Sequence, residues 1–343
     1  MRLLPAVHAA LLSALVSVPF AATPPPAAAQ SADGVNPCDF SGADAACQLA
    51  DGVYRAWKPL GEGPFPAVVY LYGSLGEADL NYRSEFFRET ITGSGHVLIV
   101  PEALSVVQYV GGITGTGWNR SGRIGDHPRD DVAFLRQVLI HAEQYFRIDR
   151  DRVIFVGQSD GGFMIWDLAC HHPEMAAAYA VHAGSYGGAL PERCDRPVRF
   201  LQTHGRQDTV VPFEAERIRE GVGLTAANPV EGLDLLARTS GCAPREAAET
   251  RQLLDFQQTA WTGCAKDGAI EYWVHDGGHG YPGSWLPTVV RWFEQFKPEP
   301  VAVGQRVIRK PGDGAQTRSA PGAGGQRFKP GTRSAGRFKA VPK

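Results

Sequence analysis

The sequence predicts an α/β fold, in which helices cover both faces of a mainly parallel sheet. Three observations predict it. Short apolar runs of strand length alternate with segments of helical periodicity between residues 67 and 296. Hydrophobic residues make up 43% of the 343 and charged residues 20%, which excludes a wholly disordered chain, a collagen and a polytopic membrane protein. A tight turn rich in glycine connects one of the apolar runs to a helix.

The expected elements follow in chain order. In the first half we expect a helix over 130–145 and strands at 67–72, 97–101 and 153–156. In the second half we expect helices at 160–169 and 285–296, and strands at 176–181, 198–202 and 270–274. Residues 221–265 fit this alternation least well, and we interpret them as an insertion near the functional site.

Residues 1–29 are typical of a signal peptide. Arg2 gives a small positive start, Leu3–Phe20 is almost wholly apolar, and Ala27-Ala28-Ala29 suits a signal peptidase. The alternative is an anchor that stays in place, but the apolar stretch is broken and short for a membrane span. We therefore expect a secreted protein, extracellular or periplasmic, with no transmembrane span.

The charge is divided between two regions. Residues 301–343 carry +9 and residues 1–29 carry +1, so the net charge of −2 leaves −12 for residues 30–300. The segment 300–343 is rich in Gly, Pro, Arg and Lys, which predicts a disordered basic tail after a single catalytic domain at 30–299. An anionic cell-surface polymer is a candidate partner for the tail, whereas nucleic acid is not expected for an exported protein.

Six cysteines in an exported chain indicate disulfides. Fifteen pairings exist, and nearest-neighbour pairing is the simplest: Cys38–Cys47, Cys170–Cys194 and Cys242–Cys264. A zinc site is the alternative, but the sequence holds no Cys-x-x-Cys motif. We predict no metal and no cofactor.

The strongest local motif is Gly157-Gln158-Ser159-Asp160-Gly161, which lies between an expected strand and an expected helix. A Gly-x-Ser-x-Gly turn in this context lifts the serine hydroxyl above the sheet. Its flanking glycines avoid the clash that a side chain would cause in so tight a turn. The sequence therefore predicts the α/β-hydrolase fold, with Ser159 as the catalytic nucleophile.

A serine nucleophile needs a histidine base that is oriented by an acid, and in this fold the chain order is serine, acid, histidine. His279 lies in a glycine-rich loop after the last expected strand, from which it can reach Ser159. His275, at the strand end, is the alternative base. Asp208 follows the expected strand 198–202 and is the predicted acid. Its alternative role is structural, as a residue that forms a turn or caps a helix.

Acyl transfer also needs N–H donors for the developing oxyanion. We predict the backbone N–H of Asp160 as one donor and that of Ser74 as the other, with Leu75 as the alternative to Ser74. Three aromatic residues are candidates for substrate binding, with simple burial in the core as the alternative for each: Trp118, Tyr281 and Trp285.

With these residues in place, the chain resembles the secreted poly(3-hydroxybutyrate) depolymerase and feruloyl/acetylxylan esterase family of α/β-hydrolases. The resemblance covers about residues 51–296 and depends on several motifs: Pro66–Gly73, Gly117-Trp118-Asn119, Asp130–Leu135, Asp149–Val153, Gly157–Gly162, His204–Pro212 and Gly277–Gly283. It implies a Ser159–Asp208–His279 triad, a carboxylic ester substrate and paired cysteines around 242 and 264.

The chain departs from the family pattern in three places. Tyr72-Gly73 stands where the family usually has His-Gly, Tyr281 stands near the catalytic histidine in place of a tryptophan, and the basic tail stands where many polymer depolymerases have a folded binding domain. The first departure bears on the geometry of the oxyanion donors or on the fit of the substrate. The last one weakens the case for attack on an insoluble polymer.

The resulting hypothesis is a secreted serine esterase that acts through an acyl-enzyme. Its candidate substrates are poly(3-hydroxybutyrate) or its oligomers, and feruloyl or acetyl esters of plant polysaccharide. One alternative is a serine peptidase of the same fold. The other is a non-catalytic binding protein that is tethered to a surface.

Overall fold

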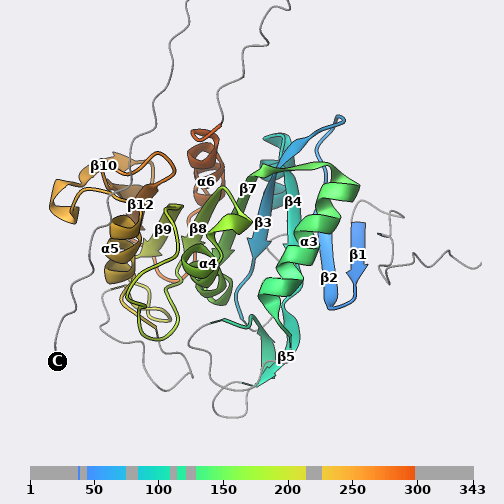
Figure 1. Ribbon diagram of the computed structural model, residues 1–343, viewed down its shortest axis with the longest axis horizontal. Coiled ribbons are helices and arrows are strands. Elements are labelled where there is room, and N and C mark those ends of the chain that lie inside the picture. The colour runs from blue at the N-terminus through green and yellow to red at the C-terminus, as the bar shows by residue number, and fades with distance from the viewer. Residues whose placement is uncertain are drawn as a thin grey trace, which may run out of the picture. The chain divides into compact units, whose positions relative to one another are not determined.

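We analysed a computed structural model of the chain (Figure 1). It describes residues 38, 45–74, 84–108, 114–120, 129–213 and 226–297. The predicted signal peptide and basic tail lie outside these ranges, so both stay predictions. Within the described ranges, no helix has the length and apolar character that a membrane crossing requires.

The main sheet has ten strands. Their spatial order is β1 (Ala45–Leu49), β2 (Gly52–Trp57), β4 (Val97–Pro101), β3 (Phe65–Leu71), β7 (Ile148–Gln158), β8 (Ala178–His182), β9 (Arg199–Gly205), β12 (Ala269–His275), β11 (Phe256–Ala260) and β10 (Glu249–Leu253). The strands from β4 to β12 pair in parallel, and the strands at either edge pair antiparallel. A small second sheet joins β5 (Leu104–Gln108) to β6 (Thr114–Gly117).

Helices cover the main sheet. They are α2 (Glu85–Gly93), α3 (Asp131–Phe146), α4 (Asp160–His171), α5 (Pro229–Thr239) and α6 (Trp285–Glu294), with short 3-10 turns at Pro173–Met175 and Arg245–Ala247. In Figure 1, α3 and α4 lie in front of the central strands, and α2 packs against α6 and β4. The Asp130 carboxylate begins α3 by accepting a bond from the Ala133 N–H at 3.0 Å.

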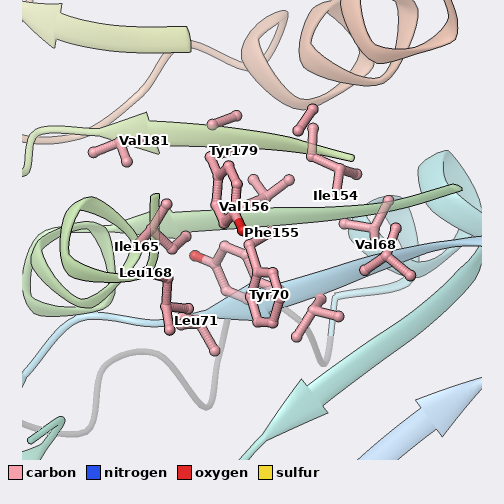
Figure 2. Packing of buried hydrophobic residues seen from close by; sticks show 14 of the residues in the cluster. Val68, Tyr70, Leu71, Ile154, Phe155, Val156, Ile165, Leu168, Tyr179 and Val181 are labelled. Carbon is pink, nitrogen blue, oxygen red and sulfur yellow. The ribbon is translucent and has the colours of Figure 1, made fainter. Parts of the chain in front are cut away.

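The core is densest around β3 and β7. All residues of β3 and of β8 are buried, as expected for parallel strands covered on both faces. Figure 2 shows Tyr70 and Leu71 of β3 near Val156 of β7, with Ile165 and Leu168 of α4 packed against them. This rigid centre fixes the turn that leaves β7 and begins α4.

The predicted α/β-hydrolase fold is confirmed, and each expected strand and helix is present within a few residues of its predicted bounds. Residues 226–265, part of the expected insertion, form α5 together with β10 and β11, which extend the main sheet. Three disulfides join the cysteines in the predicted nearest-neighbour pairing: Cys38–Cys47, Cys170–Cys194 and Cys242–Cys264.

Candidate active site

Ser159 occupies a sharp turn between β7 and α4. Its backbone adopts φ 51° and ψ −122°, a conformation that costs free energy in a residue with a side chain. Its N–H donates to the carbonyl of His182 at 3.0 Å. A Cβ atom at Gly161 would lie 2.1 Å from the Leu71 carbonyl oxygen, and one at Gly157 would lie 2.8 Å from the same atom. The turn therefore requires both glycines of the motif.

The loop that follows β3 lies directly against Ser159. A Cβ atom at Gly73 would lie 3.0 Å from the Cβ of Ser159 and 3.6 Å from its Oγ. Ser74, the next residue, is half-buried. Ser74, a predicted donor, thus directly follows the residue that packs against Ser159, whereas the alternative donor Leu75 lies outside the described residues.

Asp208 holds His279. The Nδ1 atom of His279 lies 2.8 Å from the Oδ2 atom of Asp208, and the other carboxylate oxygen accepts bonds from the N–H groups of Val210 and Val211, each at 2.9 Å. The Asp208 side chain is fully buried, whereas 24% of the His279 side chain is exposed. A buried carboxylate with both oxygens hydrogen-bonded thus orients a histidine that is partly open to solvent.

A second histidine, His204, supports the same carboxylate. Its Nδ1 accepts a bond from the Gln202 side chain at 3.1 Å, so the proton is on Nε2, which donates to the Val211 carbonyl at 2.7 Å and lies 3.4 Å from Asp208 Oδ2. Burial alone would raise the pKa of Asp208, but the hydrogen bonds from His204, His279 and the Val211 N–H outweigh it and hold that pKa well below its ordinary value. Asp208 is therefore an anion at neutral pH. Sequence reasoning missed His204; its signal was a position four residues before Asp208 at a strand end.

The loop that carries His279 is pressed onto the end of β9. A Cβ atom at Gly205 would lie 2.1 Å from the Gly278 carbonyl oxygen, and the Gln207 N–H donates to the Gly277 carbonyl at 2.9 Å. The Gln158 side chain donates to the His279 carbonyl at 3.3 Å. Because Gln158 immediately precedes Ser159, this contact links the His279 loop to the turn that carries Ser159.

His275, the alternative base, lies inside the protein. Its Nδ1 accepts a bond from the Gly277 N–H at 3.0 Å, and its ring stacks on that of His182 with centroids 5.4 Å apart. Burial lowers the pKa of His275, and burial lowers the pKa of His182 well below its ordinary value. His275 shapes the start of the loop, and His279 is the histidine beside Asp208.

The three aromatic candidates differ in exposure. Trp118 and Trp285 are fully buried and offer no exposed surface in this conformation. Tyr281 is half-buried and stacks on Trp285 with centroids 4.4 Å apart. Burial also raises the pKa of the Tyr281 hydroxyl, which keeps it neutral. Of the three, Tyr281 alone presents surface to a ligand.

The side chain of Asp160 has a role that the sequence did not suggest. It accepts a bond from the Arg120 Nε at 2.6 Å and from the Trp118 backbone N–H at 3.0 Å. Arg120 carried no motif that could reveal this pairing, because its partner is forty residues away in the chain.

Neither of two cavities in the described part of the chain lies at this site. One of 390 Å³ is lined by Glu174, Arg196 and Arg199 among others, and one of 260 Å³ by Asp234 and Trp261 among others. Among the same residues, Cys38, Cys47 and His141 bring ligand-type atoms within 4.8 Å of one another, but the two sulfur atoms are bonded to each other.

The known proteins that this chain resembles in sequence or structure are named as esterases. No protein-family model matches the chain. The chain is 27% identical over 240 residues to "Putative esterase NocK" of Nocardia uniformis subsp. tsuyamanensis, covering 65% of this chain and 67% of that protein. It is 28% identical over 171 residues to feruloyl esterase C of Emericella nidulans, covering 48% of this chain and 56% of that enzyme. The chain thus spans little more than half the length of that feruloyl esterase.

Among solved structures, acetyl xylan esterase from Aspergillus awamori superposes with a TM-score of 0.52 at 16% identity, covering 72% of this chain and 97% of that one. This likeness supports the fold, and the sequence relatives support the resemblance stated above. The chain therefore has the α/β-hydrolase fold and resembles esterases in its sequence.

Proposed function

We propose that the protein is a secreted serine esterase that hydrolyses carboxylic esters through an acyl-enzyme. The observation that carries this proposal is the 2.8 Å contact between His279 Nδ1 and buried Asp208, on a loop that also contacts Gln158 beside Ser159. The proposed nucleophile, base and orienting acid thus follow the carboxyl ends of three parallel strands, β7, β12 and β9.

In the proposed reaction, His279 Nε2 takes the proton of the Ser159 hydroxyl as its oxygen attacks the ester carbonyl carbon. The Asp160 and Ser74 N–H groups donate to the resulting oxyanion. Collapse of the tetrahedral intermediate breaks the ester C–O bond, and His279 gives its proton to the departing alcohol. Water then attacks the acyl-enzyme in the same manner and releases the acid. The Asp208 anion stabilises the imidazolium in both steps.

The names of the sequence relatives favour a feruloyl ester as substrate. Acetyl esters of polysaccharide and 3-hydroxybutyrate oligomers are the other members of the substrate class. Tyr281 is the aromatic residue that we propose to line the substrate site, because it is only partly buried and lies two residues after His279 on the same loop. Release of ferulate, acetate or 3-hydroxybutyrate from a matched panel of small esters distinguishes the three.

Export is part of the proposal. Three disulfides are typical of proteins that fold in an oxidising compartment, and residues 1–29 have the features of a signal peptide. Binding of an anionic cell-surface polymer by the basic residues 300–343 remains a prediction from the sequence.

The direct test compares hydrolysis of p-nitrophenyl butyrate by the wild-type protein and by Ser159→Ala. We expect turnover by the wild type and a loss of at least 10³-fold in the variant. Equal rates would contradict the serine mechanism. Cleavage of peptides without ester turnover would favour the peptidase alternative, and absence of any turnover would favour a binding protein.

A further inference from the structure

Trp118 is bonded to both chain segments that hold the proposed oxyanion donors. Its indole N–H donates to the carbonyl of Tyr72 at 2.9 Å, and its backbone N–H donates to the Asp160 carboxylate at 3.0 Å. Tyr72 lies two residues before Ser74, directly after β3. Asp160 is the first residue of α4. One fully buried residue therefore connects the two walls of the oxyanion site.

Arg120 completes the connection. Its Nε lies 2.6 Å from Asp160 Oδ1, and the two side chains are only 1% and 2% exposed. The Asp160 carboxylate lies on the residue whose backbone N–H faces the developing negative charge. A buried carboxylate there would repel an oxyanion, and the adjacent guanidinium offsets that repulsion.

The segment is also held from its other side. The N–H of Asn119 donates to the Asp131 carboxylate at 2.6 Å, and the Asn119 side chain donates to the carbonyl of Arg129 at 2.9 Å. Residues 118–120 are thus fixed between the first residue of α3 and the first residue of α4. A segment that is hydrogen-bonded on both sides can fix the distance between the two backbone N–H donors.

We propose that Trp118 and Arg120, acting through the Asp160 carboxylate, are positioning residues that set the separation of the Ser74 and Asp160 N–H donors. The proposal rests on the proposed esterase function. Neither residue touches substrate. Because oxyanion donors are matched to the transition state, a small displacement lowers kcat while KM stays nearly constant.

The test replaces Trp118 with Phe, which removes the indole N–H and keeps an aromatic ring. Trp292→Phe is the matched control, since Trp292 is also fully buried and its indole N–H donates to Glu271 at the same 2.9 Å, away from the proposed site. Each variant is assayed on a p-nitrophenyl ester and on its thiono analogue, in which sulfur replaces the carbonyl oxygen. Sulfur is a weak hydrogen-bond acceptor, so the thiono ester gains little from the oxyanion donors.

We expect Trp118→Phe to lower kcat on the oxygen ester about tenfold and on the thiono ester less than twofold, with KM within about twofold, so that the oxygen-to-sulfur rate ratio falls. We expect Trp292→Phe to keep the wild-type ratio. Arg120→Lys, which keeps the charge beside Asp160 but not the guanidinium geometry, should give an intermediate ratio and serves as the second arm if Trp118→Phe does not fold.

A wild-type ratio in Trp118→Phe or in Arg120→Lys, or an equal loss on both esters, would overturn the positioning role. A wild-type protein that hydrolyses neither ester would instead overturn the proposed function. Fluorophosphonate labelling of Ser159 at full stoichiometry in each variant shows that the nucleophile itself is intact.

Discussion

His279 Nδ1 lies 2.8 Å from Asp208 Oδ2, and the Asp208 carboxylate is completely enclosed by protein. Its other oxygen, Oδ1, accepts bonds from two backbone N–H groups, and His204 Nε2 lies 3.4 Å from Oδ2. The carboxylate therefore has no freedom to rotate away from His279. It fixes the ring orientation and leaves Nε2 free to act as the base.

Asp208→Asn removes the charge that stabilises the His279 imidazolium. We expect kcat on a soluble ester to fall by roughly 10²–10⁴-fold, with KM little changed. Asp276→Asn is the control, because Asp276 is 96% exposed on the same loop as His279. Near-normal turnover by Asp208→Asn would show that another acid orients the base.

Substitution of His279 and substitution of His275 should have clearly different effects on kcat. We expect His279→Ala to lower kcat by at least 10³-fold, because no base remains beside Ser159. His275→Gln keeps an acceptor for the Gly277 N–H and should lower kcat by less than tenfold. Steady-state assays of both variants decide the question, and the reverse order of losses would make His275 the base.

Gly205 lets the His279 loop approach β9. In Gly205→Ala the new Cβ would meet the Gly278 carbonyl oxygen at 2.1 Å, so the loop must move. We expect kcat to fall at least tenfold and the free energy of unfolding to decrease. Gly283→Ala, on the same loop with no atom within 4 Å of its new Cβ, should match the wild type in both measurements. An unaffected Gly205→Ala would contradict the observed packing of the loop.

Stability should depend on pH below about 6.5. Burial lowers the pKa of His182 and of His275, so the unfolded chain binds more protons than the folded one below the unfolded value of about 6.5. The stabilisation is complete above that pH and is lost as pH falls. We expect Tm at pH 5 to lie roughly 3–6 °C below that at pH 7.5.

His182→Phe should reduce that dependence, because the ring packing remains and one titrating group is removed. Calorimetric scans at the two pH values measure it. The loss of the 2.9 Å bond to Thr203 should lower Tm equally at both pH values. The same pH dependence in His182→Phe as in the wild type would mean that His182 is not a source of it.

The sequence was informative where local patterns coincide with the fold. Parallel central strands such as 153–156 are short apolar runs, and the turn at Ser159 has steric requirements that only glycine meets, so both could be predicted. The outer strands β1, β2, β10 and β11 were missed because their sequences mix polar with apolar residues and show no continuous apolar run. Their pairing is set by tertiary contacts.

The candidate site likewise contains residues that sequence patterns indicate and residues that only tertiary contacts reveal. Ser159, Asp208 and His279 follow strand ends in the order that the fold requires, so their spacing sufficed to propose them as candidates. The role of Arg120 could not be found, because no local pattern encodes its contact with Asp160. His204 offered only its position four residues before Asp208 at a strand end, which does not by itself reveal the contact with that carboxylate. The buried state of Trp118 also depends on tertiary packing alone.

The central claim is that Ser159 is the nucleophile of an ester hydrolase. Its most direct test is mass spectrometry of the protein after reaction with a fluorophosphonate, alongside ester turnover. We predict one adduct per chain, located on Ser159, with turnover lost in proportion to labelling. An adduct on another residue, or full ester turnover by the fully labelled protein, would contradict the claim.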